Sequence, residues 1–136
     1  MPIQIQGLSP LLQVFDMPTS IRFYRDVLGF QVTGTSPALL DNPDDVNWAM
    51  LQLCNATVML NTAYESEYRP AAPEPGRINN HDDTCIYFGC PDVDGTYEYL
   101  LAKGLELDKP KVAYYGMKQL YLKDPDGFGL CFQWKA

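Results

Sequence analysis

The chain has 136 residues, 46% of them hydrophobic, with ten Lys and Arg against seventeen Asp and Glu. That length suits one compact domain or two small modules, and the apolar fraction is large enough to stabilise a folded core. The formal charge of −7 and the lack of a basic stretch argue against nucleic acid or an anionic membrane as partner. We expect a cytoplasmic protein with reduced cysteines, since the sequence has no signal peptide and no long apolar run.

The two halves of the sequence repeat one order of predicted elements. A short apolar run at residues 11–16 precedes a helical pattern at residues 18–28, which ends before Gly29. The same order returns as an apolar run at residues 85–90 and a helical pattern at residues 93–101, with Gly104 as the stop signal. From Asp to Gly, the first repeat spans thirteen positions (16 to 29) and the second spans twelve (92 to 104). The halves therefore match almost in register.

Each helical pattern is followed by sequence that favours strands. The predicted strands are residues 30–33, 48–53 and 57–61 in the first half, and residues 111–115, 119–123 and 128–134 in the second half. We therefore predict an α+β fold of two βαβββ modules within a single domain, residues 8–61 and 84–135. The linker, residues 62–83, is rich in proline and acidic side chains; it either closes over a pocket or only connects the modules.

Two motifs carry a family resemblance. SIRFYRDVLGF at residues 20–30 and GMKQLYLKDPDG at residues 116–127 resemble the two signatures of the vicinal oxygen chelate superfamily, which includes glyoxalase I, extradiol dioxygenases and bleomycin resistance proteins. The resemblance implies that the two modules form curved mixed sheets around a cup, with the helices on the outer face. The second motif is most similar to the bleomycin resistance branch.

Enzymes of this superfamily hold a divalent metal at four strand positions, which the resemblance places at Ser9, Met59, Cys85 and Cys131. Hard cations bind carboxylate, carbonyl or imidazole groups, so we expect no metal and no other cofactor. The two cysteines leave alternatives open: a soft-metal thiolate site, a reversible disulfide or a covalent adduct, as opposed to inert packing.

Alternation along the strands predicts the composition of the cup face, because residues two apart share a face. One face of each module is almost purely aliphatic, whereas the other mixes aromatic, sulfur-containing and amide side chains, as ligand pockets do. The predicted ligand-binding residues are Gln13, Phe15, Trp48, Met50, Met59, Asn61, Cys85, Tyr87, Tyr115, Tyr121, Cys131 and Gln133. Ordinary half-buried filler or a dimer interface would have a similar composition.

The hypothesis that follows is a metal-independent, homodimeric small-molecule-binding protein, similar to bleomycin resistance proteins, that sequesters a neutral or cationic ligand. The acidic composition favours the cationic ligand. A glyoxalase-like lyase or isomerase with altered metal ligands is the alternative, and a structural or regulatory dimer with a filled cup is a third. We interpret His81 as a solvated linker residue, and Asp124 and Asp126 as turn residues rather than catalytic carboxylates.

Overall fold

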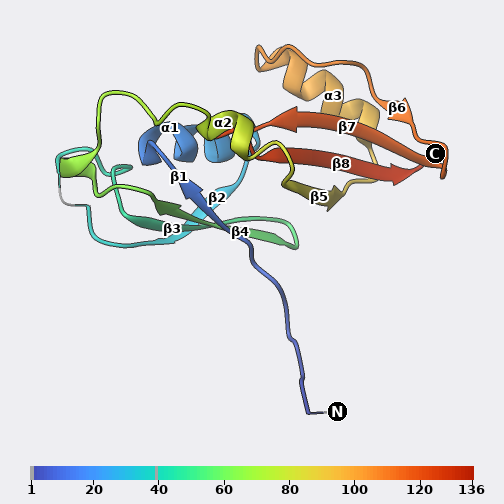
Figure 1. The fold of residues 1–136 in the computed structure, drawn as a ribbon. Helices are drawn as coiled ribbons and strands as arrows, with labels where there is room; N and C mark the ends of the chain where they lie inside the picture. The colour runs from blue at the N-terminus through green and yellow to red at the C-terminus, as the bar shows by residue number, and fades with distance from the viewer. Residues whose placement is uncertain (1, 39) are drawn as a thin grey trace. The chain divides into compact units, whose positions relative to one another are not determined.

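The computed structural model describes residues 2–38 and 40–136 and divides into two compact units, Met1–Ala72 and Pro73–Ala136. Each unit contains one open four-stranded mixed sheet (Figure 1). In both units the order is strand, helix and then three strands, so the predicted α+β class with two βαβββ modules is confirmed. Among the described residues, no helix has the length and apolarity needed to span a membrane.

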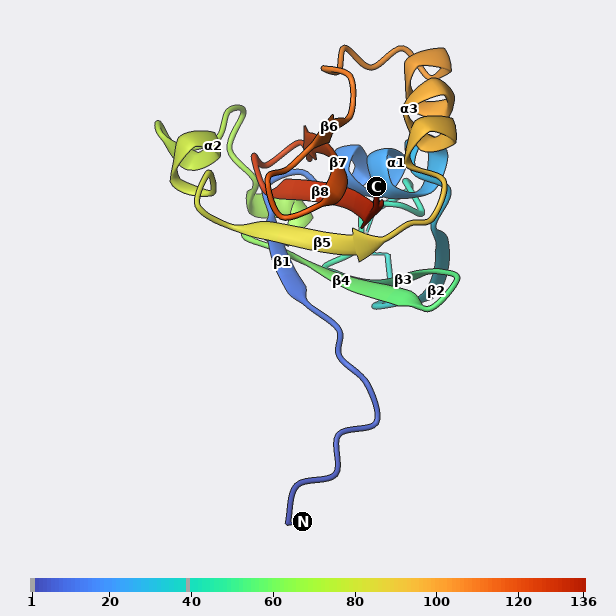
Figure 2. The same cartoon turned by 90° about the vertical axis from the view of Figure 1, so that its right-hand side faces the viewer.

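The first unit builds its sheet in the order β1-β4-β3-β2. β1 runs parallel to β4, and the other pairs are antiparallel. The elements of this unit are β1 (Leu11–Val14), α1 (Met17–Arg22), the π-helical turn η1 (Phe23–Val27), β2 (Gln31–Thr35), β3 (Trp48–Leu53), β4 (Ala56–Thr62) and the 3-10 turn η2 (Ser66–Tyr68). Residues before β1 extend away from this sheet as an irregular segment (Figure 2).

The second unit repeats that topology in the order β5-β8-β7-β6, with β5 parallel to β8. Its elements are α2 (Arg77–Asn80), β5 (Cys85–Gly89), α3 (Val93–Ala102), β6 (Lys111–Val112), β7 (Met117–Lys123) and β8 (Gly129–Lys135). The strand predicted at residues 111–115 is wrong beyond residue 112. There the chain reverses instead, because Gly116 adopts a φ of 89° and its N–H donates to the carbonyl of Ala113 at 2.9 Å.

Both long helices begin and end as the sequence predicts. Asp16 and Asp92 cap the N-termini, their carboxylates accepting from the backbone N–H three residues later. Gly29 and Gly104 follow the C-termini with φ of 94° and 92°. The first helix is not regular, however: from Phe23 onward it widens into η1. This π-helical turn takes up one more residue than an α-helical turn would.

Strand alternation separates a buried face from an open face in each sheet. In β1, Leu12 and Val14 are buried whereas Leu11 and Gln13 are exposed. On the same face as Leu12, Ala49 and Leu51 of β3 and Val58 and Leu60 of β4 are also fully buried. The predicted division into an aliphatic face and a mixed face is therefore confirmed for this sheet, and burial of this aliphatic face is the main source of stability.

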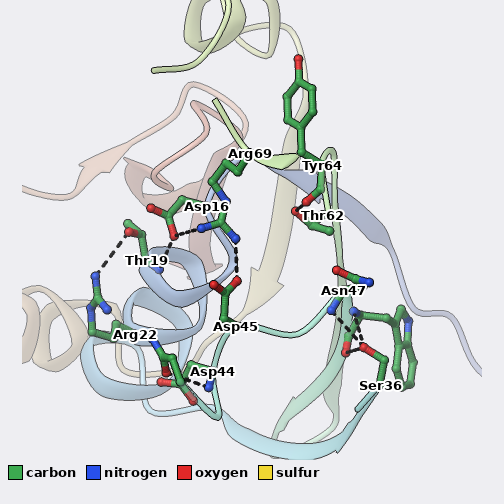
Figure 3. A network of polar contacts seen from close by, with 12 residues as sticks. Asp16, Thr19, Arg22, Ser36, Asp44, Asp45, Asn47, Thr62, Tyr64 and Arg69 are labelled. Carbon is green, nitrogen blue, oxygen red and sulfur yellow. Dashed lines mark hydrogen bonds and ion pairs between the residues drawn. The ribbon is translucent and has the colours of Figure 1, made fainter. Parts of the chain in front are cut away.

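A polar network fixes the loops of the first unit around the start of α1 (Figure 3). Arg69 pairs with Asp45 at 2.6 Å and lies 3.7 Å from the Asp16 carboxylate. On the other side of this network, the Ser36 hydroxyl accepts from the backbone N–H groups of Asn47 and Trp48, each at 3.0 Å. These contacts hold the segment after β4 and the start of β3 in place, and Trp48 with it.

In the second unit, α2 is fixed to the turn between β7 and β8. The Arg77 guanidinium donates to the buried Asp126 carboxylate at 2.9 Å. The His81 ring stacks on Phe128 with centroids 3.9 Å apart, and its Nδ1 lies 2.7 Å from the Asp126 carbonyl oxygen. The interpretation of His81 as a solvated linker residue is therefore wrong, because the turn supplies a ring and an acceptor for it.

Asp124 acts as the predicted turn residue, whereas the Asp126 carboxylate instead pairs with Arg77. The Asp124 carboxylate accepts from the backbone N–H groups of Asp126 and Phe128, both at 2.9 Å. Gly127 has a φ of 87°, and a Cβ at this position would lie 2.4 Å from the carbonyl oxygen of Ile78 in α2. Glycine is thus required here by both the backbone conformation and the close approach of α2.

Candidate functional site

The strands of the second unit place five of the predicted ligand-binding residues on its open face, one of them Cys85 on β5. The register aligns Tyr87, Cys131 and Tyr121 across β5, β8 and β7, and it places Gln133 opposite Gln119. Residues paired across a sheet point to the same side of it. Tyr87 and Tyr121 are each 49% exposed, so their rings offer accessible aromatic surface.

The polar groups on this face form one continuous chain of hydrogen bonds. The Tyr87 and Tyr121 hydroxyl oxygens are 2.9 Å apart, and the Tyr121 hydroxyl donates to Gln119 Oε1 at 3.1 Å. Gln119 Nε2 donates to the Tyr115 hydroxyl at 2.7 Å and to Gln133 Oε1 at 2.9 Å. We call these five residues the Tyr–Gln chain. The bond to Tyr87 and partial burial together raise the pKa of Tyr121 well above its usual value.

Gln119, which is the centre of the Tyr–Gln chain, is not among the ligand-binding residues predicted from the sequence. It is buried, and both the oxygen and the nitrogen of its amide are used within the Tyr–Gln chain. A signal was available, because Gln119 lies two residues before Tyr121 and so shares its face. The hairpin register that places it opposite Gln133 could not be fixed from the spacing alone.

A cavity of about 240 Å³ lies beside the Tyr–Gln chain in the second unit. Its lining comes from the segment before β6, from that strand, from the turn after it and from β7: Asp108, Lys109, Lys111, Ala113, Gln119 and Tyr121. Ligand pockets commonly start at about 300 Å³, so this volume would hold a fragment of a small molecule rather than a large compound. Its two lysines, Lys109 and Lys111, are not among the site residues predicted from the sequence.

The two cysteines on this face are free thiols. Cys131 is fully buried, and burial raises its pKa to about 11. Cys85 is an exposed residue, but partial desolvation of its thiol also raises its pKa. Both therefore hold their protons near neutral pH, which makes them poor nucleophiles and poor metal ligands.

The first unit places five predicted residues on its own open face. The register aligns Gln13, Asn61 and Trp48 in one row across β1, β4 and β3. Met59 and Met50 are paired in the neighbouring row. Four of these five side chains are half-buried, and Gln13 is exposed. The result is a surface of aromatic, thioether and amide groups.

Phe15 lies beyond the end of β1. Its ring meets that of Tyr64 edge to face, with centroids 6.1 Å apart. The prediction for Phe15 assumed that the strand alternation continued, whereas β1 ends at Val14. Phe15 thus adjoins the row of Gln13 without being part of the sheet.

The positions at which the family resemblance implies a metal do not suit a hard cation. In the first unit the Ser9 hydroxyl is hydrogen-bonded to the Thr57 hydroxyl, and Met59 offers only a thioether. In the second unit the matching groups are the protonated thiols of Cys85 and Cys131. Hard divalent ions need charged or carbonyl oxygen ligands, so this donor set does not fit one. Across residues 2–38 and 40–136, no three His, Cys, Asp or Glu side chains are grouped as ligands of a metal would be.

A sequence model of the family described as the Glyoxalase/Bleomycin resistance protein/Dioxygenase superfamily matches residues 7–132. A search of curated proteins found no match.

Several solved structures share the fold. TioX from Micromonospora sp. ML1 is 18% identical, with a TM-score of 0.72, over 96% of this chain and 99% of that one. A bleomycin-binding protein complexed with bleomycin is 17% identical, with a TM-score of 0.70, over 97% and 100%. TnmS3, an antibiotic-binding protein from Streptomyces sp. CB03234, is 19% identical, with a TM-score of 0.69, over 100% and 99%.

Proposed function

Since the chain belongs to the glyoxalase/bleomycin resistance protein/dioxygenase superfamily, we propose that it is a small-molecule-binding protein that sequesters its ligand without a metal ion. Membership confirms the resemblance carried by the two sequence motifs. The Tyr–Gln chain beside the cavity of the second unit is the observation that carries the proposal. It combines accessible aromatic rings with a few ordered polar groups, which is the usual composition of a ligand site.

The open faces of both units supply the proposed ligand contacts. The residues predicted in the first unit offer stacking and thioether contacts, and those in the second offer phenol and amide groups. One protein with this fold binds bleomycin and another is an antibiotic-binding protein, which favours an organic antibiotic as the ligand, with one fragment of it in the cavity of about 240 Å³. We further propose that the protein forms a homodimer. We also propose a cytoplasmic location, because four free cysteines suit a reducing compartment.

The side chains at the four positions that match the family's metal ligands fit metal-independent binding better than metal-dependent catalysis. A lyase or isomerase related to glyoxalase I needs an ion to polarise its substrate, and the matching positions here carry a hydroxyl, a thioether and two protonated thiols. Sequestration requires only complementary shape, stacking and hydrogen bonds.

A thermal-shift screen tests this function. The full chain is tested against bleomycin, other glycopeptides and uncharged and cationic aromatic compounds, with and without EDTA. A ligand present at 100 times its Kd stabilises the folded state by about 2.7 kcal/mol, and EDTA leaves that gain unchanged. The proposal fails if no compound stabilises the protein, or if purified protein contains a stoichiometric transition metal whose removal abolishes binding.

A further inference from the structure

With the amide orientations that the structure gives Gln119 and Gln133, the protons of the Tyr–Gln chain have one order. Gln119 Nε2 has two hydrogens, and both are used, one on the Tyr115 oxygen and one on Gln133 Oε1. Gln119 Oε1 accepts the hydroxyl hydrogen of Tyr121. Because that hydrogen is used, the short contact between the two tyrosines must be filled by Tyr87 donating to the Tyr121 oxygen. The central amide of Gln119 therefore sets the direction of every bond in the chain.

This order gives the two ends of the chain opposite polarity. At one end, the Tyr115 hydroxyl hydrogen and the Nε2 hydrogens of Gln133 have no acceptor among the described residues. At the other end, Tyr87 has spent its hydrogen and presents only lone pairs. Tyr87 and Tyr115 are 49% and 55% exposed, so both ends can be reached by a ligand. The face thus offers donors beside β8 and an acceptor on β5.

Two lysines place positive charge beside the donor end of the Tyr–Gln chain. All six lysines of the chain lie in the second unit. Lys111 pairs with Gln119 in the sheet register, and Lys109 and Lys111 line the cavity with one carboxylate, that of Asp108. The second unit as a whole is acidic, with ten Asp and Glu against these six lysines and Arg77, so only the two lysines at the cavity place positive charge beside this face. Ammonium groups close to amide and phenol donors favour an electron-rich oxygen and disfavour an organic cation.

We infer that the open face of the second unit selects an uncharged aromatic carbonyl compound, whose carbonyl oxygen accepts from Gln133 and Tyr115 and whose hydrogen donor meets Tyr87. Aromatic carboxamides, lactams and hydroxy-substituted ketones belong to this class. The inference rests on the proposed function and narrows it, because it replaces the cationic ligand expected from composition. Discrimination arises since a ligand of the wrong polarity leaves donors or lone pairs unpaired on the face.

Three probes that each contain a single phenyl ring test this polarity. Acetophenone has a hydrogen-bond acceptor only, benzamide has an acceptor and a donor, and benzylamine is a cation at pH 7. Each is titrated into the ¹⁵N-labelled full chain, and the side-chain amide signals of Gln119 and Gln133 are followed. We expect benzamide to bind most tightly, acetophenone next and benzylamine least, with the Gln133 signal moving most for the two carbonyl probes. Each hydrogen bond should change affinity about fivefold.

Single substitutions test the contribution of the donor end of the Tyr–Gln chain to binding. Gln133→Met and Tyr115→Phe should each weaken acetophenone and benzamide about fivefold and leave benzylamine unchanged. Tyr99→Phe is the matched control, because Tyr99 is a similarly exposed tyrosine on α3 of the same unit. This control should bind all three probes as the wild type does.

The inference would be overturned if benzylamine bound more tightly than the two carbonyl probes. It would also be overturned if benzylamine, which has no acceptor, moved the Gln133 signal more than they do. If the probes leave both glutamine signals unchanged while a compound in the thermal-shift screen still stabilises the protein, the inference fails and the proposed function stands. If nothing binds in either experiment, both fail.

Discussion

Replacing Gly127 by alanine tests whether α2 is locked to the turn between β7 and β8. Three glycines of the second unit have nearly the same backbone conformation, with φ of 92° at Gly104, 89° at Gly116 and 87° at Gly127. Only at Gly127 would a Cβ collide with another element, 2.4 Å from the Ile78 carbonyl oxygen. At the other two positions nothing lies within 4 Å of the added atom.

The expected magnitudes differ accordingly. Gly104→Ala and Gly116→Ala should each lower the free energy of unfolding by about 1–2 kcal/mol, the cost of a left-handed conformation for a residue with a Cβ. Gly127→Ala incurs the same cost and also forces α2 away from the turn, which separates Arg77 from the buried Asp126 carboxylate. Losing one partner of a buried ion pair costs about 3–5 kcal/mol, so this variant should lose at least about 3 kcal/mol more than the controls.

Urea unfolding followed by circular dichroism measures the three values under one condition, with equal m-values as the check that the folded and unfolded states are comparable. Equal losses at all three positions would refute the reasoning, because they would mean that α2 is not held against the turn. A variant in which Arg77→Met is added to Gly127→Ala should lose little more than Gly127→Ala alone, since the ion pair is already broken.

Three further results are expected. Arg69→Met should lower the free energy of unfolding in urea by about 2 kcal/mol, because the poorly exposed Asp45 carboxylate loses a charged donor; an unchanged midpoint would contradict this. Folded wild type should lose stability as the pH rises from 9 through about 11, since the folded Cys131 thiol keeps its proton after the unfolded one has lost it, and Cys131→Ala should show a shallower loss over that range in unfolding curves. Iodoacetamide at pH 8 should alkylate the exposed Cys54 well before the buried Cys131, as read by mass spectrometry of peptides; equal rates would contradict the burial of that thiol.

Local patterns were enough to predict most of the fold. The bounds of β3 at 48–53 match the prediction, because a run of apolar residues between turn signals defines them. The helix ends at Gly29 and Gly104 were also predictable, since a glycine in the left-handed region ends a helix by a local mechanism. β6 was predicted too long because the turn at residues 113–116 depends on one positive φ that the sequence signalled only weakly.

The contacts that the sequence could not predict join residues far apart in the chain. The pair of Arg77 and Asp126 spans 49 positions, and no periodicity marks either residue as buried. His81 likewise owes its environment to Phe128, which is not its sequence neighbour. Predicted site residues such as Tyr87 and Tyr121 shared a face through strand alternation, whereas the direction of their hydrogen bonds depends on Gln119 and on the register between β7 and β8.

The widened turn η1 explains how the two repeats came to differ in length while keeping the same ends. Asp16 and Gly29 bracket one more residue than Asp92 and Gly104 do, yet both segments start with a capping aspartate and stop at a left-handed glycine. The surplus residue is absorbed inside the helix, where Leu28 donates to the carbonyl five residues earlier. One residue more or fewer at this point can thus be accommodated without shifting the strands on either side, so we expect single-residue deletions within 23–27 to be tolerated better than deletions in β1 or β4.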